Sequence, residues 1–157
     1  LDRIHRRVRS SVALSLAALI VRPHAAIVAH LGDSRVYRLR AGQLDQLTRD
    51  HSLYEQLLET GADLPPLDQF AYANVVTRAL GAAEDDRPEL HTLDLQDDDR
   101  YLLCSDGLSG VLGPDEIAAQ LAHTPIESVA DVLVDAAFAA GSRDNITAIV
   151  VHVRRRA

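Results

Sequence analysis

The chain has 157 residues, 47% of them hydrophobic, and a formal net charge of −7 at pH 7. This length suits a single domain over residues 1–157 that buries a core of its own. The negative charge argues against a nucleic-acid partner, because affinity for phosphate backbones comes mainly from Lys and Arg. Cys104 is the one cysteine. An intrachain disulfide is therefore excluded, which favours a cytoplasmic location.

The N-terminal third has the pattern of antiparallel strands. Apolar residues at helical spacing first predict the end of an amphipathic helix at 1–9. Three apolar segments follow, at 11–21, 25–32 and 34–40, and together with the stretch 44–47 after them they predict a run of antiparallel hairpins. The basic segment 6–10 and the apolar run 12–21 also resemble a secretory signal peptide. This apolar run is too short to cross a bilayer as a helix, and its alternation suits a buried strand. We favour the strand and expect no membrane span in this chain.

The middle of the chain changes character. Residues 52–61 predict a short helix, N-capped by Ser52 and ended by Gly61. Paired prolines within 62–72 exclude a central strand or a helix interior. We expect a mobile surface excursion there.

The C-terminal half combines strands and helices. Three segments have strand patterns: 91–95, 101–105 and 145–153. A helix is predicted over 113–123, with Pro114 at its first position. A second helix is predicted to run to Gly141 from a capping box made by Thr124 and Glu127. Antiparallel strands with helices segregated beside them predict an α+β domain.

Three aspartates lie where predicted strands end: Asp33 in GDS, Asp106 in SDG and Asp144 in RDN. Carboxylates at such positions can converge on a hard cation such as Mg²⁺ or Mn²⁺. The alternative is ordinary turn chemistry, since Asp beside Gly or Asn also bonds nearby backbone N–H groups. The seven histidines are scattered without paired metal spacing, which disfavours zinc.

Four blocks, taken together, carry a family resemblance: AHLGDSRVYRLRAGQLDQLTRDHS at 29–52, VVTRALG at 75–81, LLCSDGLSG at 102–110 and GSRDNITAIVV at 141–151. In order, they resemble the later blocks of the type 2C metal-dependent serine/threonine protein phosphatases, most of all the bacterial branch. The resemblance implies an antiparallel β-sandwich flanked by α-helices in α-β-β-α layers. It also implies hydrolysis of phosphoserine and phosphothreonine in proteins by water activated at a binuclear Mn²⁺ or Mg²⁺ centre.

The resemblance assigns roles to particular residues. Asp106 and Asp144 match the acids that hold the second metal, and Asp33 matches a carboxylate of a weaker third metal. Asn145 and Gly107 match supporting positions beside that centre. Residues 48–73 match the flap beside the active site, which influences the choice of substrate. The implied partner is a phosphorylated protein that is the product of a cognate Ser/Thr kinase.

The sequence departs from the family at three points. The early blocks, including the aspartate that bridges both metals, are not in these 157 residues, so the expected fold is N-terminally incomplete. RSSVALS at 9–15 replaces an expected Gly-Thr-Thr block, and Gly110 stands where many relatives carry an acid. Two hypotheses follow. The chain is either the larger part of an active phosphatase or a non-catalytic, phosphatase-like module that binds a phosphoprotein or a regulatory partner.

Overall fold

A computed structural model describes residues 14–23, 25–81 and 87–155. The helix predicted at 1–9 lies outside these residues. The described elements follow one another in this order: β1 (Leu16–Val21), β2 (Ala25–Leu31), β3 (Arg35–Arg40), β4 (Gln43–Gln46), α1 (Leu53–Glu59), the 3₁₀ helix η1 (Leu67–Gln69), β5 (Glu89–Asp94), β6 (Arg100–Cys104), α2 (Asp106–Ser109), α3 (Pro114–His123), α4 (Val129–Ala139) and β7 (Ala148–His152).

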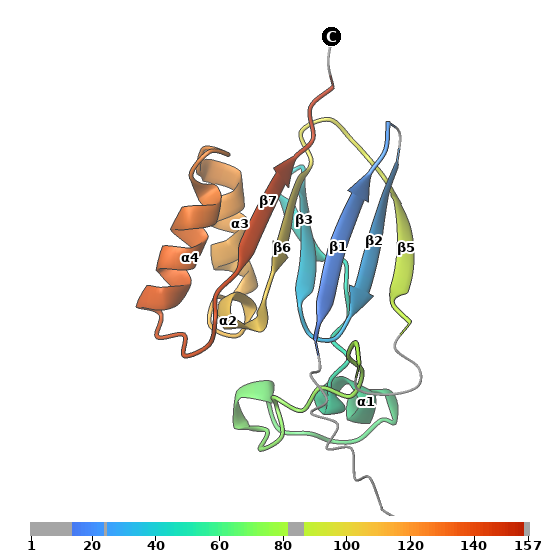
Figure 1. Ribbon diagram of the computed structural model, residues 1–157. Coiled ribbons are helices and arrows are strands. Elements are labelled where there is room, and N and C mark those ends of the chain that lie inside the picture. The colour runs from blue at the N-terminus through green and yellow to red at the C-terminus, as the bar shows by residue number, and fades with distance from the viewer. Residues whose placement is uncertain (1–13, 24, 82–86, 156–157) are drawn as a thin grey trace, which may run out of the picture.

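The described strands form two sheets that pack face to face (Figure 1). One sheet has the order β1-β2-β5 and the other β4-β3-β6-β7, and every neighbouring pair is antiparallel. The alternation of strand side chains sends Leu19 and Val28 of the first sheet to the interior. There they pack against Val36 and Leu103 of the second sheet. This confirms the predicted antiparallel sandwich and the α+β class.

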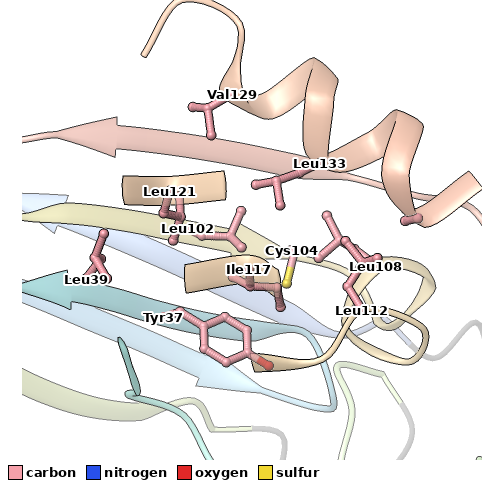
Figure 2. Close-up of a cluster of buried hydrophobic side chains, with 11 residues drawn as sticks. Tyr37, Leu39, Leu102, Cys104, Leu108, Leu112, Ile117, Leu121, Val129 and Leu133 are labelled. Carbon is pink, nitrogen blue, oxygen red and sulfur yellow. The ribbon is translucent and has the colours of Figure 1, made fainter. Parts of the chain in front are cut away.

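Helices α3 and α4 cover the outer face of the four-stranded sheet (Figure 1). Between sheet and helices lies the larger buried cluster, drawn in Figure 2, which includes Leu102, Leu108, Ile117 and Leu133. Each such side chain contributes about 1.5–3 kcal/mol by leaving water. Because Leu108 belongs to α2, this core also fixes the short helix that follows β6. The described residues thus show three of the four expected layers, α-β-β.

Helix boundaries confirm one predicted cap and correct another. Ser52 caps α1, its Oγ accepting from the N–H of Glu55 at 3.2 Å. The capping box of Thr124 and Glu127 is wrong, because α4 begins at Val129 with Ser128 as its N-cap. A turn from Pro125 to Ser128 comes between the two helices, and Thr124 ends α3 instead, where its hydroxyl bonds Gln120.

Among the described residues, no helix is both long enough and apolar enough to cross a bilayer. The longest, α4, has 11 residues. A membrane-spanning helix needs about 20.

His30 of β2 lies inside the sandwich with 1% of its surface exposed. Burial lowers the pKa of His30 from its ordinary 6.5, and the neighbouring His51 lowers it further. Asp50, Glu89 and the backbone of Gly32 oppose this shift without overcoming it. His30 is therefore neutral in the folded protein near pH 7 and resists protonation as the pH falls.

The depressed pKa of His30 predicts a loss of stability in mild acid. The unfolded chain takes up a proton at this position as the pH falls below 6.5, whereas the folded chain does not. Between pH 7.5 and 5.5 the free energy of unfolding should fall by up to about 1.4 kcal/mol more than in a His30→Leu variant. Urea titrations of both proteins at the two pH values measure this difference. Equal pH dependence would contradict the prediction.

Candidate metal centre

The three aspartates singled out in the sequence lie at the same end of the sandwich. Asp33 is in the turn after β2, Asp106 opens α2 directly after β6, and Asp144 lies in the loop before β7. Figure 1 shows the end of β2, helix α2 and the start of β7 at this end. Partial burial raises the pKa of Asp106, and the charges of Asp33 and then Asp144 raise it further. The structure therefore brings Asp33 and Asp144 close enough to Asp106 for their charges to act on it.

A pocket of about 740 Å³ opens beside these acids. Asp33 and Asp106 contribute to its lining, as do Tyr54, Leu67 and Phe70 from the segment 48–73. Two rings of that segment, Tyr54 and Phe70, stack edge to face with centroids 5.3 Å apart. The pocket thus combines acidic groups with an aromatic and apolar surface.

Asp106 and Asp144 are each oriented by their own turn. The N–H of Gly107 donates to Asp106 Oδ1 at 2.9 Å, and the N–H of Asn145 donates to Asp144 Oδ1 at 2.7 Å. Both are the local side-chain bonds that Asp makes at turns. Here the turn interpretation and the metal interpretation are compatible, because a carboxylate has two oxygens and the turn uses one.

The loop of Asp144 is tied to α2 by close backbone contacts. Ser105 Oγ donates to Asn145 O at 2.9 Å and accepts from the N–H of Thr147 at 3.0 Å. Ser142 Oγ donates to Gly107 O at 2.7 Å. A Cβ atom on Gly107 would lie only 2.4 Å from Asn145 O. Gly107 is needed because only glycine allows the two loops to approach this closely.

The structure also places an ion pair at the pocket that sequence reasoning missed. Arg35 donates through Nε and Nη2 to both carboxylate oxygens of Asp50, at 2.9 and 2.7 Å. Both residues line the pocket. The two are distant in sequence, and a single sequence holds no signal that would pair them. The bidentate geometry occupies the guanidinium, so Arg35 is committed to Asp50.

A second cluster of potential ligands, His30, His51 and Glu89, lies outside the lining of this pocket. Arg78 Nη1 sits 2.7 Å from Glu89 Oε1 and 2.9 Å from His51 Nε2. Hydrogen bonds from His51 and then from Arg78 lower the pKa of Glu89. Because Arg78 and His51 already bind Glu89 Oε1, we describe the cluster as a salt-bridge network.

The donor set of Asp33, Asp106 and Asp144 fits a hard divalent cation. All three offer carboxylate oxygen, the ligand that Mn²⁺ and Mg²⁺ prefer over nitrogen or sulfur. Burial and then the charges of Asp33 and Asp144 raise the pKa of Asp106, and a cation bound there would favour its charged form.

Comparison with known proteins decides the family. The family model of protein phosphatase 2C matches residues 5–145. The chain belongs to the protein phosphatase 2C family. Protein phosphatase PhpP of Streptococcus pneumoniae is 36% identical over 140 residues, which cover 87% of this chain and 56% of PhpP.

Solved structures of protein phosphatase 2C relatives agree with this fold. The crystal structure of the serine/threonine phosphatase PstP of Mycobacterium tuberculosis matches with a TM-score of 0.84 and 32% identity, over 90% of this chain and 60% of that one. A PstP catalytic domain in complex with two manganese ions matches with a TM-score of 0.80 and 33% identity, over 90% and 59%. The chain thus spans less than two thirds of these relatives.

Proposed function

We propose that the protein containing this chain hydrolyses phosphoserine and phosphothreonine in proteins, with Mn²⁺ or Mg²⁺ as cofactor. The observation that carries the proposal is the approach of Asp33 and Asp144 to Asp106 at one end of the sandwich, where Asp33 and Asp106 also line the pocket. In this assignment Asp106 and Asp144 hold the second metal of a binuclear centre, and Asp33 holds a weaker third. Gly107 and Asn145 support them by keeping the loop before β7 against α2.

Bound divalent ions supply Lewis acidity toward phosphoryl oxygens and lower the pKa of an attacking water. The chain's own contribution is to hold the carboxylates in place on rigid strand ends. Tyr54, Leu67 and Phe70 of the flap, residues 48–73, contact the substrate around its phosphorylated residue. No covalent step on cysteine is invoked, since burial raises the pKa of Cys104 to about 12 and keeps the thiol protonated.

The substrate in this proposal is a protein phosphorylated by a cognate Ser/Thr kinase. Streptococcal PhpP and mycobacterial PstP are both named as phosphatases, and PstP as a serine/threonine phosphatase. A reducing compartment, the cytoplasm, suits the free thiol of Cys104, the one cysteine of the sequence.

A second candidate is a non-catalytic, phosphatase-like binding module. Gly110 favours it, because it lines the pocket beside Asp106 and offers no side-chain oxygen to a cation. Such a module would bind the phosphoprotein through the same pocket without turning it over.

Metal removal separates the two functions. The full-length protein, first stripped with a chelator, should release no phosphate from a phosphothreonine peptide, and adding Mn²⁺ should restore release. Phosphate is measured colorimetrically, and binding of the same peptide is measured by fluorescence anisotropy. Peptide binding without turnover at saturating Mn²⁺ would contradict the enzyme and support the module.

A further inference from the structure

We propose that His51 is a positioning residue that fixes the turn carrying Asp33 and thereby sets the affinity of the cation site to which Asp33 belongs. The inference rests on the proposed function and assigns a role to a residue outside the metal ligands. His51 does not line the pocket that Asp33 and Asp106 share. It therefore acts on Asp33 only through the backbone.

His51 holds Gly32, the residue before Asp33, by two hydrogen bonds. The N–H of Gly32 donates to His51 Nδ1 at 2.9 Å, and the N–H of His51 donates to Gly32 O at 2.8 Å. Both polar groups of the Gly32 backbone are thus bound by one residue. An acceptor at Nδ1 is essential to this arrangement.

The opposite ring nitrogen explains why Nδ1 is an acceptor. Because Nδ1 accepts from Gly32, the ring proton of neutral His51 resides on Nε2. His51 Nε2 lies 2.9 Å from Glu89 Oε1, which accepts that proton's hydrogen bond. Arg78 Nη1, 2.9 Å from the same ring nitrogen, donates to Glu89 Oε1 at 2.7 Å instead. The carboxylate therefore selects the tautomer that can hold Gly32, as carboxylates do for metal-binding histidines.

The turn is fixed on its other side as well. Gly32 has a φ of +104°, and a Cβ there would lie 2.4 Å from Ser15 Cβ. Ser34 Oγ, on the residue after Asp33, lies 2.8 Å from Ser15 Oγ. With both neighbours held, the backbone position of Asp33 is fixed by contacts outside the pocket.

His51 is itself well anchored. Thr77 donates to His51 O through its N–H at 2.7 Å and through Oγ1 at 3.0 Å. The ring packs on buried His30, with centroids 4.8 Å apart. The clamp on Gly32 is therefore shielded from water, which strengthens its hydrogen bonds.

The effect of His51 should be confined to Asp33. Asp106 and Asp144 are oriented by their own turns and by the contact between Gly107 and Asn145. A change at position 51 therefore alters one class of cation site and leaves the other intact.

Two conservative variants separate positioning from general structural support. In His51→Asn the side-chain oxygen replaces Nδ1 and keeps the bond to Gly32. In His51→Gln the amide reaches toward Glu89 in place of Nε2 and loses Gly32. Titration of the full-length protein with Mn²⁺, followed by electron paramagnetic resonance, first identifies the class of site that Asp33→Asn removes.

We expect His51→Gln to weaken that Asp33-dependent class about 10-fold or more, the loss typical of removing an outer-shell partner. His51→Asn should stay within about 3-fold of the unaltered protein, a small part of that range. Amide hydrogen exchange should show Gly32 protected in the unaltered protein and in His51→Asn. Loss of this protection in folded His51→Gln with unchanged Mn²⁺ affinity would overturn the inference. An unprotected Gly32 N–H in the unaltered protein would overturn it as well, and that result can be measured even if His51→Gln fails to fold.

The possible failures are distinguishable. Equal Mn²⁺ affinity of the Asp33-dependent class in two folded variants would overturn the role of His51 alone. Absence of any Mn²⁺ binding that depends on Asp106 would overturn the proposed function, and the role of His51 with it.

Discussion

Replacement of Asp106 by asparagine should lower Mn²⁺-dependent hydrolysis of a phosphothreonine peptide by at least about 100-fold, because loss of an outer-shell partner alone often costs 10–100-fold. Asp106 is the acid whose pKa responds to both Asp33 and Asp144. In the proposed assignment it is a ligand of the second metal. Asparagine keeps the shape of the side chain and removes the charge that the cations need.

The same variant should fold normally. Partial burial, followed by repulsion from Asp33 and Asp144, opposes the charged form of Asp106 in the metal-free protein, so removing that charge relieves both. Metal-free Asp106→Asn should therefore melt no lower than the unaltered protein, while Mn²⁺ should raise its melting temperature less. Asp135→Asn, which removes an exposed acid from α4, should keep full turnover. Unchanged turnover in Asp106→Asn would refute the assignment of the metal ligands.

Local patterns were sufficient to predict the elements and the fold class. Strand alternation located β2, β3 and β6, and the prolyl start of α3 located that helix. The capping box at Thr124 failed because the pattern is satisfied by many turns, and Pro125 begins one here. The sequence SDG is typical of a turn, yet Asp106 and Gly107 begin the short helix α2. Leu108 of that helix packs into the core.

The site was less accessible to sequence reasoning than the fold. Spacing made each aspartate a plausible turn residue, and only the family resemblance brought Asp33, Asp106 and Asp144 together. Periodicity reports which face of an element is buried, but it cannot report which strand ends meet. The contact of His51 with Gly32 was missed for the same reason, since the ring and the N–H of His51 bind the backbone of a distant residue, and a backbone group carries no signal in the sequence.

Gly107 should tolerate no larger residue, because its neighbour is backbone. In Gly107→Ala the new methyl group would lie 2.4 Å from Asn145 O and 2.9 Å from Asn145 C. A backbone carbonyl cannot rotate away as a side chain can, so the loop before β7 has to move from α2. Overpacking of this kind costs about 1–3 kcal/mol. The movement would also separate Asp144 from Asp106, which weakens any cation that both hold.

Two measurements on Gly107→Ala, the free energy of unfolding and the Mn²⁺ affinity, should therefore fall together. Gly113→Ala is the matched control, since a Cβ at Gly113 meets nothing within 4 Å. Its cost is limited to the weaker N-cap of α3, about 1 kcal/mol, with no change in Mn²⁺ affinity. If Gly107→Ala kept both its stability and its Mn²⁺ affinity, the contact between α2 and Asn145 would not be what holds Asp106 and Asp144 together.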